Sequence, residues 1–194
     1  FNAIKEEMKM VYLHDNRPWM IGYSGGKDST LLCQLVFEMV ESLKPAQRKK
    51  KIYIVTSDTM VENPIVQKYM HKMCDAINRS NNTQNLNIKA HIIYPDINQT
   101  FWSLVIGKGY PTPEPPGVRW CTERLKINAS NKFTYDTIKN DGEIVILLGV
   151  RKDESAARAR SITSHEIEGK ILTPHNQIDK AYVYSPLSKI KNDV

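Results

Sequence analysis

The chain has 194 residues, of which 41% are hydrophobic and 25% are charged, and this size and composition are those of an ordinary folded domain. That composition excludes disordered and collagenous chains. The printed residues hold no apolar run of bilayer length, so we expect a cytoplasmic protein that has no membrane partner. The net charge of +6 is compatible with polyanionic partners such as nucleic acid, nucleotides or pyrophosphate.

The order of helix and strand signals predicts one α/β domain. Apolar residues recur at helical spacing in residues 1–12, in residues 31–43 and after Pro64, and short apolar runs predict strands at residues 19–23, 52–56, 88–94, 143–150 and 182–184. Helices between strands require parallel crossovers, so we expect a three-layer, mostly parallel sheet flanked by helices over residues 1–194. Because the chain lacks an initial Met and stops abruptly, we also expect it to lack the C-terminal residues of a longer protein.

Several segments carry more specific expectations. Polar residues 78–87 predict a surface loop, and the basic run of residues 48–51 predicts an exposed loop. The proline-rich residues 110–117 are too rich in proline for regular structure and predict a lid, a DNA-facing loop or a rigid connector. Cys33 and Cys74 lie on apolar helix faces, where we expect core thiols. The helix after Pro64 is expected to turn these apolar residues inward: Ile65, Val66, Tyr69, Met70, Met73, Cys74 and Ile77.

The stretch SGGKDS, residues 24–29, lies between a predicted buried strand and a predicted helix. Its two glycines allow a tight turn and close approach to a ligand, and the following helix directs free N–H groups into that turn. Hydroxyls at Ser24 and Ser29 and the charge of Lys27 favour a phosphate chain over a carboxylate. Ser57, Asp58 and residues 151–160 also follow predicted strands, so the three loops are expected to converge at one edge of the sheet.

Two common phosphate-binding patterns do not match this stretch. The Walker pattern needs Ser or Thr after Gly-Lys and a glycine five residues before the second glycine, whereas Asp28 and Ile21 occupy these positions. The dinucleotide-binding pattern fails because no third glycine follows.

The SGGKDS stretch resembles the PP-loop of the ATP pyrophosphatase family, whose members cleave ATP between its α and β phosphates to adenylate a substrate. The resemblance implies ATP and Mg²⁺ as ligands. It implies that the departing pyrophosphate is held by Ser24, Gly25, Gly26, Lys27 and Ser29, and that Ser57, Asp58 and Thr59 frame the adenosine. Asp28 would either orient the loop or belong to the shell of the magnesium ion.

Downstream motifs are similar to those of the phosphoadenylyl-sulfate reductase branch, and most similar to the sulfurtransferases of DNA phosphorothioation (DndC and SspD type). These motifs are SDTMVENP, RWCTERLKI, GVRKDESAARARS and YVYSPL. The resemblance implies that ATP activates a DNA backbone phosphate and that sulfur from a cysteine desulfurase replaces a non-bridging oxygen. It also implies other phosphorothioation subunits as partners.

Arginines and one cysteine are the remaining candidates for catalysis. Arg151, Arg158 and Arg160 would clamp phosphate charge in the transition state, and Arg151 stands directly at a predicted strand end. Cys121 lies among basic residues that favour a thiolate. By resemblance it would ligate a 4Fe-4S cluster whose other ligands lie outside this chain, or it would handle sulfur itself.

Two rival functions fit the same motifs. One is a phosphoadenylyl-sulfate or adenylyl-sulfate reductase, and the other is a non-catalytic, ATP-gated DNA-binding subunit. The intact Lys27 and its neighbouring serines favour catalysis.

Overall fold

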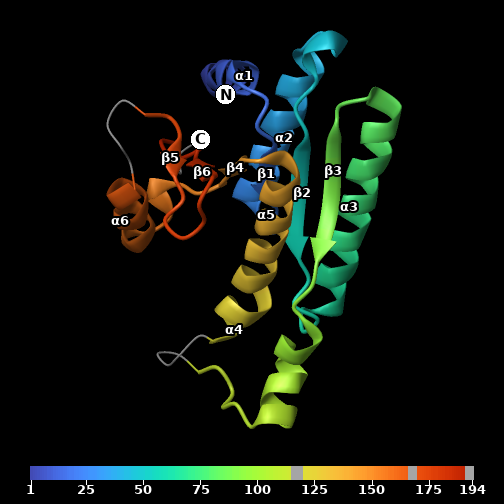
Figure 1. The fold of residues 1–194 in the computed structure, drawn as a ribbon, viewed down its shortest axis with the longest axis vertical. Coiled ribbons are helices and arrows are strands. Elements are labelled where there is room, and N and C mark those ends of the chain that lie inside the picture. The colour runs from blue at the N-terminus through green and yellow to red at the C-terminus, as the bar shows by residue number, and fades with distance from the viewer. Residues whose placement is uncertain (115–119, 166–169, 191–194) are drawn as a thin grey trace.

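The structure is a computed structural model that describes residues 1–114, 120–165 and 170–190, without the side chains of residues 157, 158, 161, 164 and 165. Its centre is a six-stranded sheet with the order β3-β2-β1-β4-β6-β5 (Figure 1). All neighbouring strands are parallel except β5 and β6, which are antiparallel. The strands are β1 (Trp19–Gly22), β2 (Ile52–Ser57), β3 (Ile88–Ile93), β4 (Ile144–Leu147), β5 (Thr173–Pro174) and β6 (Ala181–Tyr184).

Helices cover both faces of this sheet, which confirms the predicted α/β class. They are α1 (Asn2–His14), α2 (Lys27–Ser42), α3 (Pro64–Gln84), α4 (Trp120–Thr122), α5 (Asn128–Asp141) and α6 (Ala156–His165). Residues of α1, α2 and α3 form the larger apolar core with one face of the sheet, and α5 packs on the smaller core of the other face. None of the helices in the described ranges combines the length and the apolar character needed to cross a membrane.

The last turns of α3 correct the prediction of a surface loop at residues 78–87. The helix runs to Gln84, because two asparagine side chains bind the backbone of the edge strand β3. The amide of Asn78 both donates to the Ala90 carbonyl at 3.2 Å and accepts from the Ala90 N–H at 2.8 Å. Asn81 accepts from the Ile88 N–H at 2.8 Å. The asparagines therefore stay helical by satisfying polar groups of β3 that have no strand partner on that side.

The first turns of α3 also differ from expectation. Met70, Cys74 and Ile77 are buried as predicted, but Ile65, Val66 and Tyr69 are exposed, Ile65 by 79%. The helix begins at Pro64, beyond the ends of the strands, so its first apolar residues have no sheet beneath them. Of these three, Tyr69 lies beside Gly25 in the loop after β1.

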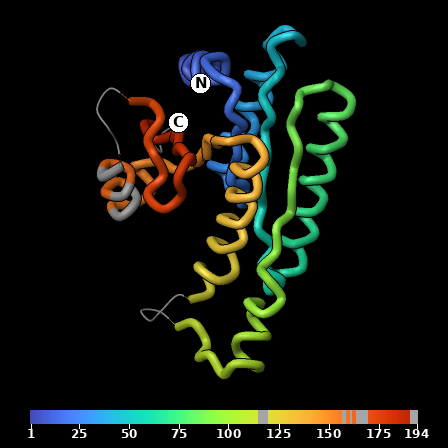
Figure 2. The backbone as a smooth tube through the Cα atoms, viewed as in Figure 1, coloured from blue at the N-terminus to red at the C-terminus, as the bar shows by residue number. Residues whose placement is uncertain are grey.

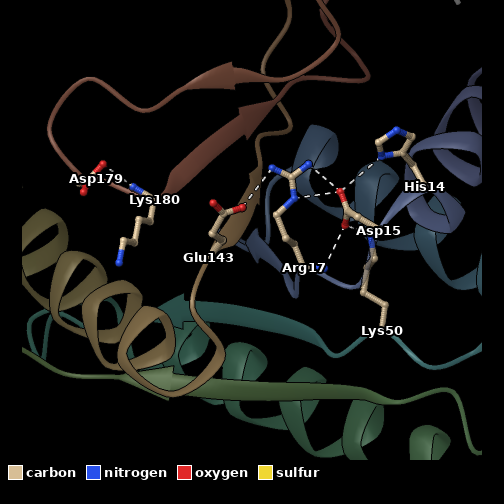
Figure 3. A network of polar contacts seen from close by, with 7 residues as sticks. All are labelled: His14, Asp15, Arg17, Lys50, Glu143, Asp179 and Lys180. Carbon is tan, nitrogen blue, oxygen red and sulfur yellow. Dashed lines mark hydrogen bonds and ion pairs between the residues drawn. The ribbon is translucent and has the colours of Figure 1, made fainter.

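Charged residues tie the amino ends of the strands together (Figure 3). Lys50 lies 3.0 Å from the Asp15 carboxylate and above the Trp19 ring, with its side chain only 2% exposed. Arg17 contacts the same carboxylate at 2.6 Å and reaches Glu143 at 3.6 Å. The expectation of an exposed basic loop is thus wrong for Lys50, because Asp15 and two aromatic rings compensate its burial.

An arm extends from the opposite edge of the sheet. Figure 2 shows the chain leaving β3, running beyond the carboxyl ends of the strands, and returning through α5. The described part of the arm contains three short helical turns in addition to α4, at η2 (Ile97–Gln99), η3 (Ser103–Gly107) and η4 (Glu123–Ile127). Residues 110–114 lack regular structure, as predicted, and residues 115–117 lie outside the described ranges.

Candidate nucleotide site

The loop of residues 24–29 connects the carboxyl end of β1 to the first turn of α2. Gly25 has φ +74°, a conformation that side-chain-bearing residues rarely adopt, and the Tyr69 ring of α3 lies 3.5 Å from the position that a Cβ atom would take. The positive φ favours glycine here, whereas the distance to Tyr69 is an ordinary van der Waals contact that a Cβ atom could also make. The glycine at position 25 is therefore explained by backbone shape.

Serine hydroxyls fix the shape of this loop from within. The Ser29 hydroxyl donates to the Gly26 carbonyl at 3.0 Å and lies 3.1 Å from the Ser24 hydroxyl. The Ser24 N–H in turn reaches the Ser29 hydroxyl at 3.3 Å. Ser29 is buried and Ser24 is exposed, so one serine holds the turn while the other faces solvent.

Among the described side chains, none caps the first turn of α2. The cap residue is Gly26, which has no side chain to accept these hydrogen bonds, and Lys27 beside it is exposed. A 16-residue helix of this kind carries a partial positive charge at its start. The helix end, Lys27 and the Ser24 hydroxyl together make a suitable cradle for an anion.

Arg151 and Asp28 join the loop after β4 to this cradle. The Arg151 Nε atom lies 2.8 Å from Asp28 Oδ1, and Nη2 donates to Oδ2 at 3.5 Å. The side chains are 6% and 18% exposed. Gly149 lies against the same turn, because a Cβ atom there would stand 3.0 Å from the Asp28 carbonyl oxygen.

The loop after β2 is held by the buried carboxylate of Asp58. It accepts hydrogen bonds from the Met60 N–H at 2.8 Å and from the Gln67 amide at 2.8 Å, and it lies 3.4 Å from His71 Nε2. Burial alone would raise the pKa of Asp58, but these partners lower it below the ordinary value. Asp58 therefore joins its loop to α3, the helix that also contacts Gly25.

The residues on either side of Asp58 also lie at the carboxyl end of β2. Thr59 is buried and donates to Glu62 at 3.1 Å, and Ser57 is half-buried at the end of β2. All three predicted loops thus lie at the carboxyl edge, with α3 and the ion pair of Arg151 as the connections between them.

Cys121 lies in the arm, half-buried in α4. The ring of its neighbour Trp120 is stacked on Phe101 at 5.7 Å and donates from Nε1 to the Pro111 carbonyl at 2.9 Å. One ion pair links this region to the loop after β2, since Lys126 Nζ lies 3.2 Å from Glu62. The helical segment that contains Cys121 is therefore connected to the loop after β2 by the ion pair between Lys126 and Glu62.

The other two cysteines belong to the core, as predicted. Cys33 and Cys74 are 7% and 3% exposed, and burial raises the pKa of Cys33 to about 12. Thiols of this kind are poor metal ligands and poor nucleophiles. Within the ranges that the structure describes, no group of three or more His, Cys, Asp or Glu side chains is arranged to hold a metal ion.

The remaining predicted arginines are placed only in part. Arg160 is exposed on α6 and donates to the Ala156 carbonyl at 3.3 Å within its own helix. Arg158 belongs to α6, but its side chain lies outside the described atoms, as does the whole of Arg119. The predicted role of Arg158 therefore stays a prediction.

Sequence reasoning missed Tyr69 and Gly149 as parts of the site. Tyr69 was expected in the core because it fits the apolar stripe of α3, and nothing in its spacing separates an end turn from a covered turn. Gly149 carried a usable signal, since a glycine inside a predicted buried strand suggests close approach of another backbone.

A hollow of about 400 Å³ lies at the other edge of the sheet. Its lining includes Arg17, Asp141 and Glu143, all of which form ion pairs within the protein. Ligand-binding sites of parallel sheets lie beyond the carboxyl ends of the strands. The hollow therefore lies at the wrong end of the strands for the candidate site, which is at the carboxyl ends.

Comparisons with known proteins support the fold. No protein-family model matches the chain. An uncharacterized protein of Methanocaldococcus jannaschii is 25% identical over 158 residues, which are 81% of this chain and 28% of that protein. The chain thus spans little more than a quarter of this curated relative.

Solved structures with the same architecture include three enzymes. Phosphoadenylyl-sulfate (PAPS) reductase from Candida auris, in a phosphate complex, has a TM-score of 0.51 at 11% identity and covers 99% of this chain and 80% of that chain. The U34-tRNA thiolase NcsA from Methanococcus maripaludis, with its 4Fe-4S cluster, has a TM-score of 0.52 at 16% identity. The match covers 99% of this chain and 59% of the thiolase chain. A mutant FMN adenylyltransferase of Candida glabrata has a TM-score of 0.53 at 12% identity and covers 97% and 51%.

At these identities the likeness shows the fold alone. The chain has a mostly parallel, six-stranded sheet flanked by helices, and these solved structures share that architecture.

Proposed function

We propose that this chain is an ATP pyrophosphatase that adenylates a DNA backbone phosphate, so that sulfur can replace one of its non-bridging oxygens. The observation that carries the ATP part is the cradle at α2, with its uncapped helix start, exposed Lys27 and glycine at φ +74°. The DNA part is supported by the downstream motifs described above and by the net charge of +6. The solved structures with this fold, which include a PAPS reductase and a tRNA thiolase, make sulfur chemistry a consistent assignment.

The chemistry requires activation of the phosphate oxygen. A non-bridging oxygen of a phosphodiester is a poor leaving group. Transfer of AMP from ATP joins this oxygen to the α phosphate and releases pyrophosphate, so that the oxygen can leave as part of AMP. A persulfide sulfur then forms the new P–S bond as AMP leaves. A thiol cleaves the S–S bond that still joins this sulfur to its carrier, which leaves a phosphorothioate in the DNA and a disulfide for a cellular reductant.

The residues of the chain would divide these tasks by position. Lys27, the N–H groups at the start of α2 and the Ser24 hydroxyl would hold the β and γ phosphates that leave as pyrophosphate. The loop of Asp58 would form the side of the site where the adenosine lies. Cys121, the one cysteine outside the apolar core, would carry or receive the sulfur.

The residues of this chain do not provide a full set of ligands for a 4Fe-4S cluster or for Mg²⁺. A 4Fe-4S cluster needs about four thiolates, and of the three cysteines of this chain two are buried in the core with raised pKa values. The only carboxylate of residues 24–29 is bound by Arg151, so Mg²⁺ would be held chiefly by the phosphates of ATP.

The decisive experiment measures which bond of ATP is cut and what accepts the product. The protein is incubated with ATP labelled at the α phosphate, with and without DNA, and the products are separated. AMP and pyrophosphate are expected, and Lys27→Met should abolish them; ADP and inorganic phosphate would refute a PP-loop enzyme. The exposed Lys68→Met on α3 is the matched control.

The acceptor needs a second assay. With a cysteine desulfurase and labelled cysteine, label should enter DNA and not tRNA, and Cys121→Ser should prevent its transfer without changing ATP binding. Label in tRNA would identify a tRNA thiolase instead. Reduction of phosphoadenylyl sulfate would identify the reductase that the Candida auris structure represents. ATP binding without cleavage of either bond would identify an ATP-gated DNA-binding subunit.

A further inference from the structure

The cradle at α2 contains a feature that opposes its ligand. Asp28 is the second residue of the helix and places a carboxylate within the loop that would receive a polyphosphate. An unpaired carboxylate in this position would repel phosphate oxygens, and partial burial would strengthen the repulsion. The loop therefore needs a fixed positive group beside Asp28.

Arg151 supplies that group. Its side chain is 6% exposed, and its guanidinium meets both oxygens of the Asp28 carboxylate, at 2.8 Å and 3.5 Å. No other ion pair with Asp28 is found among the described residues. Among the described residues both contacts of the guanidinium are to this carboxylate, and the short one, from the buried Nε atom, is an ion pair without hydrogen-bond geometry.

The backbone around Arg151 is shaped for this contact. Gly149 allows the chain after β4 to approach the Asp28–Ser29 backbone to a distance that a side chain would prevent. The Lys152 N–H donates to the Ser188 carbonyl at 3.1 Å, which fixes the chain on the other side of Arg151. The arginine is held in place from both sides, independently of any ligand.

We propose that Arg151 is a positioning residue that neutralises Asp28 and holds the phosphate-binding turn in its anion-accepting form, and that it is not itself a ligand of the phosphates. Asp28 would then serve as the anchor by which Arg151 holds the loop. This inference rests on the proposed function only in taking the ligand to be a nucleotide polyphosphate.

A double-mutant cycle tests the proposal. Dissociation constants for ATP, ADP and AMP are measured by calorimetry for wild type, Arg151→Met, Asp28→Asn and the double variant. Arg151→Met should weaken ATP binding by roughly tenfold or more, because it leaves Asp28 unpaired. The double variant should return to within about threefold of Asp28→Asn, because the repelling charge is gone as well.

The series of ligands separates an electrostatic effect from loss of structure. The loss caused by Arg151→Met should be greatest for ATP and smallest for AMP, since repulsion grows with the charge of the ligand. An equal loss for all three would show a merely structural role. A double variant as weak as Arg151→Met would show that Arg151 binds phosphate directly. Either result overturns the proposal.

The experiment distinguishes a variant that does not fold from failure of this inference, and failure of this inference from failure of the proposed function. If Arg151→Met does not fold, the double variant and Asp28→Asn are still compared directly, and a tenfold difference between them would refute the proposal. A wild-type protein that cleaves ATP but shows no coupling would refute this inference alone. Coupling in binding without release of pyrophosphate would refute the proposed function alone, and a wild type that binds no nucleotide would refute both.

Discussion

Gly149→Ala is the substitution whose consequence can be worked out most directly from the structure. The added Cβ atom would lie 3.0 Å from the Asp28 carbonyl oxygen, 3.1 Å from its carbonyl carbon and 3.2 Å from the Ser29 Cα atom. All three are backbone atoms of the first turn of α2, so no flexible side chain can move aside. The loop after β4 must therefore shift by a few tenths of an ångström away from α2.

The size of the effect follows from the cost of overpacking. Extra atoms in a closely packed region destabilise a protein by about 1–3 kcal/mol. For a chain of 194 residues this lowers the melting temperature by roughly 2–4 °C per kcal/mol, or about 2–12 °C in total. The same shift would carry Arg151 away from Asp28, so the affinity for ATP should fall as well.

Thermal unfolding and ATP calorimetry on the same samples measure both effects. Gly22→Ala is the matched control. Gly22 ends β1 just before the loop of residues 24–29, and an added Cβ atom there meets nothing within 4 Å. The reasoning would be refuted if Gly149→Ala were as stable as Gly22→Ala and bound ATP as tightly as the wild type. A loss of stability without a loss of ATP affinity would refute only the link to the nucleotide site.

Two further predictions concern stability. Burial alone would raise the pKa of Asp15, but hydrogen bonds from Arg17 and Lys50 lower it from 3.8 to about 2. The ionised Asp15 therefore contributes about 2 kcal/mol to the free energy of unfolding above about pH 4, and this contribution is lost as the pH falls towards 2. Urea unfolding at pH 7 and pH 2 should show that Asp15→Asn is less stable than the wild type only at the higher pH. Asn78→Ala should cost about 1–3 kcal/mol in the same assay, because both polar groups of Ala90 lose their partner, whereas Asn82→Ala on the exposed side of α3 should cost little.

The order of the elements could be predicted from the sequence because it depends on local periodicity. The apolar runs around Trp19, Ile52 and Ile144 have few alternatives to a buried parallel strand, and they are strands in the structure. The turn between β1 and α2 was also predictable, since glycine at Gly25 and the start of a helix are local properties. In both cases neighbouring residues decide the outcome.

Features that depend on distant partners could not be predicted in the same way. Lys50 is buried only because Asp15 and the rings of Tyr12 and Trp19 meet it from other elements. The pairing of Arg151 with Asp28 joins residues far apart in the sequence, and a basic residue after a strand does not reveal which acid it will meet. The charge of a residue is visible in the sequence, but its partner is set by the packing of the sheet.

The amino and carboxyl ends of the strands differ in the groups that they leave for a ligand. At the amino edge Arg17, Asp15 and Glu143 bind one another, so their charges are satisfied without a ligand. At the carboxyl edge the start of α2 is uncapped, Lys27 is exposed, and Met60 stands 53% exposed on the next loop. A positive helix end attracts an anion, and an exposed methionine beside it offers an apolar surface to a ring. A nucleotide, with a polyanionic end and an apolar base, supplies the matching groups in one molecule.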